Sequence, residues 1–272
     1  MDGLSPSQIA LLVAILAASA LMSGLSGFGF SAIGALCLIV LPPKLGVPLL
    51  MTLSAANQLM SLRQLKGELK PIGQWWPDGP APYVLGGLVG VPIGLAILAS
   101  MQTVSLMLVF GALLVGYAAY SLLRPHTEKA SVGGGWLACS LVGMSGGVIG
   151  GFTAFPGAPV VVWSGLKRLP KHESRAIVQP DIFVLQLLSI SLLALQRPQT
   201  FDRTYWLLVA ITVPVVLPCT LMGVKLYRQL SDINFRRVTF ILLGVSGLGL
   251  LIKAADTFPA VSGAIRAAGI GR

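Results

Sequence analysis

Apolar runs long enough to cross a lipid bilayer recur along almost the whole chain. A transmembrane helix needs about 20 predominantly apolar residues. Hydrophobic residues make up 55% of the 272 positions and charged residues only 10%, against about 25% charged in soluble domains. Strand-like alternation is absent, so the runs predict helices rather than a β-barrel. We therefore expect an all-α integral membrane protein, with one transmembrane domain over residues 1–272.

Two glycine-rich clusters interrupt this pattern. Gly24–Gly29 breaks one apolar stretch, and Gly143–Val148 breaks another 119 residues later. Broken helices at corresponding positions of two related halves are typical of transporters, in which they mark the binding site. Elsewhere Gly86, Gly90 and Gly94 stand four residues apart, a spacing that lets two helices pack closely.

The apolar runs divide into ten helical segments, five in each half. Repeat one covers about 8–123 and repeat two about 134–253. The second and seventh segments are short and follow the glycine breaks, so we expect them to be re-entrant or half-length helices. The predicted segments are 8–25, 28–41, 46–62, 80–99, 103–122, 134–148, 152–165, 175–195, 204–224 and 236–253.

The basic residues favour an arrangement in which each broken pair turns back. With eight crossings, the 19 Lys and Arg residues divide into 10 on one face and 9 on the other, which is no bias. With ten segments, 13 collect on one face, which the positive-inside rule assigns to the cytoplasm. Both termini are then outside. Because five is odd, the second repeat is expected to be inverted relative to the first. The 13 residues are Arg63, Lys66, Lys70, Arg124, Lys129, Lys167, Arg168, Lys171, Arg175, Lys225, Arg228, Arg236 and Arg237.

The net charge of +10 does not predict a nucleic-acid partner, because these cations fall between spans, where topology-setting charges belong. Cys37, Cys139 and Cys219 lie inside apolar runs without metal-ligand spacing, so no metal or other cofactor is predicted. No nucleophile–base set or carboxylate pair appears either, and the prediction is that the chain is not an enzyme.

Polar residues near the breaks are candidates for an anion site. Helices that start near Phe28, and near Val148 or Phe152, would present free N–H groups and a positive dipole end, a site that needs no Lys or Arg. Side chains within the spans add donors, or instead bond to their own helices and neighbours. The hydroxyl donors are Ser23, Ser26, Ser145 and Thr153, and the amides are Asn57, Gln58 and Gln179.

Asp181 is an acidic residue well inside a predicted span, six residues after Arg175. An intramembrane carboxylate suggests a function by default, as a proton carrier or a cation ligand. The alternative is an N-cap on a helix that restarts after Pro180.

The two break regions resemble the TauE/SafE family of sulfite and organosulfur anion permeases. The resemblance rests on Ser23–Ala35 (SGLSGFGFSAIGA) and Gly143–Val162 (GMSGGVIGGFTAFPGAPVVV), with two repeats of matching layout around them. It implies transport of a small anion, such as sulfite or a sulfonate, across the bacterial plasma (inner) membrane. The site residues that it implies are Ser23, Gly24, Ser26, Gly27, Phe28, Ser145, Gly146, Gly147, Pro156 and Gly157.

The leading hypothesis is therefore a secondary carrier that moves a small anion by alternating access. Its expected partners are the anion and the lipid bilayer, with a proton as the candidate coupling ion at Asp181. The competing hypotheses are a cation or metal carrier that uses Asp181, and a membrane scaffold or enzyme subunit.

Overall fold

A computed structural model describes residues 5–64, 71–123, 134–167, 169–227 and 232–257. Every regular element in these ranges is a helix, which confirms the all-helical part of the prediction. The α-helices are α1 (Pro6–Ser26), α2 (Phe30–Gly34), α3 (Pro43–Gln64), α4 (Ala81–Ser100), α5 (Thr103–Leu123), α6 (Trp136–Thr153), α7 (Gly157–Leu166), α8 (Lys171–Gln196), α9 (Arg203–Tyr227) and α10 (Asp232–Thr257). The 3-10 helices are η1 (Ala35–Ile39), η2 (Ile72–Gln74) and η3 (Pro198–Thr200).

Six of the described helices, α1, α3, α4, α6, α8 and α9, are long and apolar enough to cross a membrane. Sequence explains where the first of them begins and ends. The Ser5 hydroxyl accepts the N–H of Gln8 while the Gln8 side chain accepts the N–H of Ser5, which forms a capping box, and Pro6 occupies the first turn. The helix stops at Gly27, whose φ of +84° lies in the left-handed region that glycine adopts readily.

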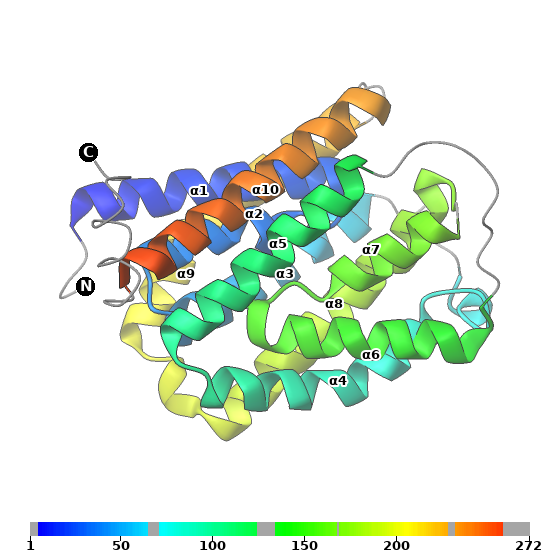
Figure 1. Ribbon diagram of the computed structural model, residues 1–272, viewed down its shortest axis with the longest axis horizontal. Coiled ribbons are helices and arrows are strands. Elements are labelled where there is room, and N and C mark those ends of the chain that lie inside the picture. Colours follow the sequence, from blue (N-terminus) through cyan, green and yellow to red (C-terminus); the bar gives the residue numbers. More distant parts are fainter. Residues whose placement is uncertain (1–4, 65–70, 124–133, 168, 228–231, 258–272) are drawn as a thin grey trace.

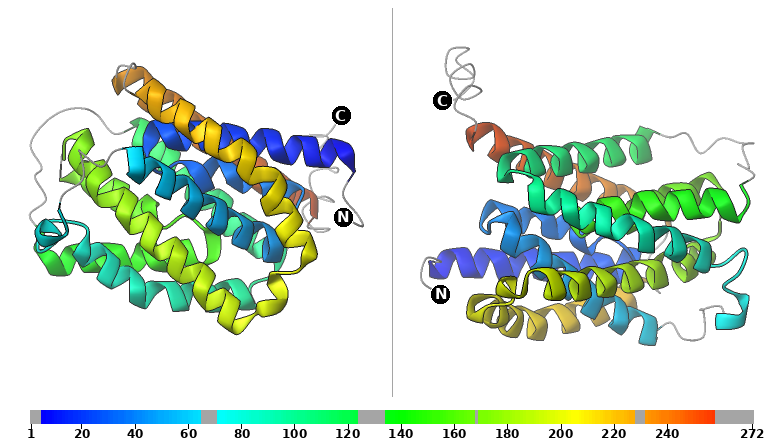
Figure 2. Two further views of the ribbon diagram at one scale, coloured as in Figure 1. Left: turned by 180° about the vertical axis from the view of Figure 1, so that it is seen from behind. Right: turned by 90° about the horizontal axis from the view of Figure 1, so that it is seen from below.

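The chain reverses direction after α1 and again after α6. α2 and η1 fold back along α1, and α7 folds back along α6 (Figure 1). As a result α1 begins and α10 ends at the same end of the bundle, called here the terminal end (Figure 2). At the opposite end, the basic end, α3, α7 and α9 finish near Arg63, Lys167 and Lys225.

The turns after α1 and α6 match the ten-segment interpretation, while the inverted repeats and the bias of 13 basic residues to one face stay predictions. Several residues of that count, however, lie outside the described part of the chain: Lys66, Lys70, Arg124, Lys129, Arg168 and Arg228.

The long helices pair around a central couple. α3 and α8 contact each other and are the most buried of the six spans. Around them α1 packs against α9, α4 against α6 and α5 against α10. A polar side chain on α3 or α8 is therefore shielded from lipid, which makes these two helices suitable for carrying polar groups across the bilayer.

Glycines bring the paired helices into backbone contact. A Cβ on Gly94 of α4 would lie 2.8 Å from the Cα of Gly151 in α6. In the same way, a Cβ on Gly24 of α1 would lie 2.9 Å from the Cα of Gly223 in α9. Close approach of this kind is the expected use of small residues between membrane helices.

The predicted position of the second break is wrong. Gly143–Val148 lies inside α6, which continues without interruption to Thr153. Its glycines face α4, because a Cβ on Gly143 would overlap the carbonyl oxygen of Tyr83 and one on Gly147 that of Gly87. The break itself falls at Ala154–Pro156, and the following helix starts at Gly157 rather than near Val148 or Phe152. In the first half the next helix starts at Phe30, close to the predicted Phe28.

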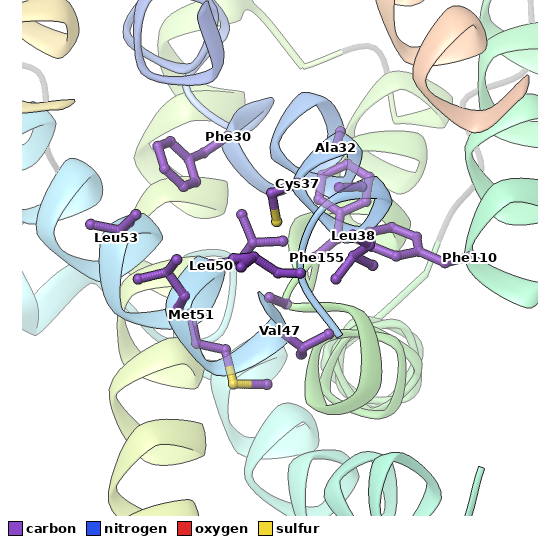
Figure 3. Close-up of a cluster of buried hydrophobic side chains, with 14 of the residues drawn as sticks. Phe30, Ala32, Cys37, Leu38, Val47, Leu50, Met51, Leu53, Phe110 and Phe155 are labelled. Atoms are coloured by element: carbon purple, nitrogen blue, oxygen red, sulfur yellow. The ribbon is translucent and has the colours of Figure 1, made fainter. Parts of the chain in front are cut away.

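An apolar cluster fills the bundle between the two breaks. Figure 3 shows side chains from α2, η1, α3 and α5 gathered around Phe155. All of the residues labelled there are buried: Phe30, Ala32, Cys37, Leu38, Val47, Leu50, Met51, Leu53, Phe110 and Phe155. The cluster separates the middle of α3 from water.

The glycine contacts between α4 and α6 predict opposite effects for two helical glycines. A Cβ on Gly90 would overlap the carbonyl oxygen of Met144, whereas nothing lies within 4 Å of a Cβ on Gly116 in α5. Gly90→Ala should lower the free energy of unfolding by about 1–3 kcal/mol through overpacking. Gly116→Ala should leave it unchanged or raise it by up to about 1 kcal/mol. Thermal unfolding of the detergent-purified proteins measures both, and equal midpoints would contradict this account of the interface.

Candidate functional site

The two helix breaks share one local geometry. At the first, the Ser26 hydroxyl donates to the Met22 carbonyl (2.9 Å) and accepts the N–H of Gly29 (3.0 Å). At the second, the Thr153 hydroxyl donates to the Ile149 carbonyl (2.6 Å) and accepts the N–H of Phe155 (3.2 Å). Each hydroxyl therefore accepts a backbone N–H within the break, so fewer N–H groups ahead of the next helix remain for an anion than the sequence predicts.

A left-handed residue follows each hydroxyl, and a buried glutamine holds its carbonyl. At the first break Gln58 Nε2 of α3 donates to the Gly27 carbonyl (3.0 Å). At the second Gln186 Nε2 of α8 donates to the carbonyl of Ala154 (2.6 Å), whose φ is +60°. In sequence, Ser26-Gly27-Phe28 thus corresponds to Thr153-Ala154-Phe155, 127 residues later. Gln186 is not among the predicted site residues, because the second break was predicted too early in the chain.

A polar network surrounds the first break. Asn57 Nδ2 donates to Ser23 Oγ (2.8 Å), and Thr220 Oγ1 donates to Asn57 Oδ1 (2.6 Å). These buried bonds join α1, α3 and α9 at one level of the bundle. Asn57 and Ser23 were predicted to lie near the site, and the structure brings them together there.

Arg175 is the cation at this break. Its Nη2 donates to the carbonyl of Gly24 (2.8 Å). This charged residue lies in a candidate membrane span, where it is only 6% exposed. A Cβ on Gly27 would lie 2.9 Å from Arg175 Nε and 2.9 Å from Gln179 Nε2. With the Gln179 amide turned so that its oxygen faces the guanidinium, that oxygen accepts from Arg175 Nε (3.2 Å) and Nη2 (3.3 Å).

Two predictions therefore change at the first break. Arg175 was counted among the charges of the loops, but it lies one turn inside α8 and reaches the break. The interpretation of the first break as an anion site without Lys or Arg also needs a change, because a guanidinium adjoins Gly27. Gln58, Gln179, Gly24 and Gly27 do meet at this place, as the sequence predicts.

The second break has apolar neighbours instead. Phe155 lies in the apolar cluster beside Leu38 and Leu50 (Figure 3). Gly157, at the start of α7, faces Ile182 and Val178 of α8. The two breaks are thus alike in backbone geometry but differ in chemistry, and only the first adjoins a described buried cation.

The remaining candidates of the second half lie on α6 and beside it. Ser145 is exposed and donates to the Val142 carbonyl of its own helix (2.7 Å). A Cβ on Gly146 would lie 2.7 Å from the carbonyl oxygen of Pro156, and Gly147 contacts α4. Ser145 therefore bonds within α6, and Gly146 and Gly147 allow Pro156 and α4 to approach that helix closely.

Asp181 is fully buried within α8, and neither carboxylate oxygen has a hydrogen-bond partner. The capping alternative is wrong, because α8 starts at Lys171 and continues through Pro180. In the described ranges, no three His, Cys, Asp or Glu side chains come together as a metal site would require.

The family model described as Sulfite exporter TauE/SafE matches residues 11–250, nearly the whole chain. The chain belongs to the TauE/SafE family. No curated protein and no solved structure matches it. As a member of a transporter family with six candidate spans, the chain is a membrane transporter.

In this TauE/SafE chain the left-handed residues at the two breaks predict a matched pair of effects. Gly27→Ala should lower thermal stability, because alanine costs about 1 kcal/mol at φ +84° and its Cβ would press on Arg175 and Gln179. Ala154→Gly relieves the same strain at φ +60° and should leave stability unchanged or raise it. Melting curves in detergent test both variants. Equal losses from the two substitutions would contradict the assignment of strain.

Proposed function

We propose that this chain is a secondary carrier of a small anion, which binds at the first break beside Arg175. The observation that carries the proposal is a guanidinium, 6% exposed, that lies among the carbonyls and amides of a broken membrane helix. Charged side chains inside membrane spans are costly and mark substrate pathways. Arg presents a planar fork of donors that matches the oxygens of an oxyanion.

The family supports a sulfur-containing substrate, such as sulfite or a sulfonate. Gln58 and Gln179 would supply neutral polar contacts around the anion, and Arg175 would balance its charge. Neutral donors alone would bind a small anion weakly, since burial of an unpaired charge is expensive. The second break, with Phe155 and Ile182 nearby, is less suited to hold a charge.

Alternating access by two inverted repeats is the proposed transport cycle. Packing between the two repeats supports it. The helix α1 of repeat one packs against α9 of repeat two, and α6 of repeat two packs against α4 of repeat one. The helices α3 and α8, one from each repeat, are in contact at the centre. The two halves differ in how the segment after the break packs on its neighbouring helix. In the first half, Leu36 and Ile39 of η1 contact Gly249 of α10. In the second half, a groove of about 520 Å³ separates α7 from α5. In the proposed cycle, η1 would separate from α10 while α7 closes on α5, and the carrier would then open to the other side of the membrane.

The proposed setting is the plasma membrane of a bacterium, with the basic end in the cytoplasm and both chain termini outside. Arg63, Lys167 and Lys225 mark the basic end, and the positive-inside rule supports this orientation. Within the bundle, the proposed coupling ion is a proton carried by Asp181, a buried carboxylate without a hydrogen-bond partner on the helix that carries Arg175.

Substitution of Arg175 tests the anion site. Arg175→Gln and Arg175→Lys should reduce sulfite uptake into proteoliposomes about 30-fold or more, because loss of a buried charge contact typically costs 2–5 kcal/mol. Lys keeps the charge without the fork, so it should restore little of the loss. Arg63→Gln is the matched control: this exposed Arg lies at the same end of the bundle, and its loss should leave uptake unchanged.

Melting curves separate a binding defect from misfolding in these variants. Addition of sulfite should raise the midpoint of the parent and of Arg63→Gln but not of either Arg175 variant. Folded Arg175 variants that transport sulfite as fast as the parent would contradict the proposed site.

Asp181→Asn tests the coupling. Asn keeps the size and polarity of the side chain but cannot carry a proton. The variant should still bind the anion, and an imposed pH gradient should no longer drive accumulation in liposomes. An Asn variant that responds to the gradient like the parent would remove Asp181 from the coupling mechanism.

A further inference from the structure

A cavity of about 430 Å³ opens at the terminal end of the bundle, far from Arg175. It lies among the start of α3, the end of α4, the end of α8 and the start of α9. Its lining combines apolar residues, such as Pro48 and Leu193, with polar and charged side chains. Those that matter here are Lys44, Gln196, Arg197, Thr200 and Asp202.

The charges of this cavity are not balanced. Asp202 Oδ1 accepts the N–H of Tyr205 (2.8 Å), so this carboxylate caps the first turn of α9. Lys44 and Arg197 lie on the facing ends of α3 and α8. Among the described residues, no carboxylate forms an ion pair with either of them. The cavity therefore has two cations against one capping carboxylate.

The cavity and the first break are separate places along the same helices. On α3, Pro48 lines the cavity and Gln58 contacts the break. Ten residues of α-helix lie between them, about 15 Å at the usual rise. The side chains between them include Leu50, Met51 and Leu53 of the apolar cluster (Figure 3). An ion in the cavity thus has no open polar path to Arg175 in this conformation.

We infer that this cavity is a second anion-binding site, which takes a small oxyanion from the aqueous phase at the terminal end. Two cations that line one cavity suit a hydrated oxyanion, and the volume falls in the range of small-ligand sites. The role of the cavity as an entrance for substrate rests on the proposed function. The preference of the cavity for anions does not rest on the proposed function, since that preference follows from Lys44 and Arg197 alone.

Charged thiol reagents measure the local potential without any need for transport. The reporter is Gln196→Cys in a background with Cys37, Cys139 and Cys219 replaced by Ser, purified in a nonionic detergent. The rate of cysteine labelling is measured with two reagents, the anionic sulfonatoethyl and the cationic trimethylammonioethyl methanethiosulfonate. The ratio of the anionic to the cationic rate should be higher for Gln196→Cys than for Gln102→Cys. Gln102 is an exposed position at the same end that does not line the cavity.

Neutralisation of the two cations should remove this preference. Lys44→Gln and Arg197→Gln should each lower the ratio at least about three-fold, because one unit charge at contact distance contributes about 1 kcal/mol in water. Arg203→Gln is the matched control, since this exposed Arg lies at the same end without lining the cavity, and its loss should leave the ratio unchanged. A ratio that equals that of Gln102→Cys, or that neither variant lowers, would overturn the inference.

The source of the anion is tested with sulfate and with phosphatidylglycerol. Millimolar sulfate should slow the labelling of Gln196→Cys in lipid-free detergent, and Lys44→Gln should abolish this protection. Protection by phosphatidylglycerol but not by sulfate would overturn the assignment to a soluble anion, because the ligand would then be a lipid phosphate. A chain that shows charge-selective labelling but no sulfite uptake would contradict the proposed function and leave the cavity site intact.

Discussion

A helix that ends inside a membrane must have its freed backbone groups satisfied by the protein itself. The two breaks of this chain meet that requirement in the same way. The hydroxyl of Ser26 or Thr153 takes up N–H groups, and the amide of Gln58 or Gln186 takes the carbonyl of the left-handed residue that follows. Because both glutamines are on the central helices, the breaks hold α3 and α8 at fixed positions relative to α1 and α6. The arrangement of the bundle depends on these bonds.

The two halves use one backbone design for different chemistry. The first break is surrounded by Asn57, Thr220 and Arg175, which come from three different helices. The second is surrounded by the apolar cluster that contains Phe155. For the proposed carrier of one small anion, a charged first break and an apolar second break suffice, since a second buried cation would add a desolvation cost without a second ligand.

Composition alone could predict the helical class, and the glycine cluster at Gly24–Gly29 could place the first break, because apolar length and helix-breaking residues are local signals. The second break could not be placed in this way. Its glycines at 143, 146 and 147 serve close packing inside α6, and the residue that ends the helix is Ala154, which carries no local signal for a left-handed turn. Arg175 was misassigned for a related reason: a basic residue one turn inside a helix resembles a loop charge until the neighbouring helix is known.

Selenite can locate the anion directly, because it resembles sulfite in shape and charge and its selenium scatters anomalously. Crystals of the chain grown with selenite should show an anomalous peak beside the Arg175 guanidinium, within contact of Gln58 and Gln179. A peak at the second break near Phe155, with none beside Arg175, would contradict the central claim that this guanidinium holds the transported anion.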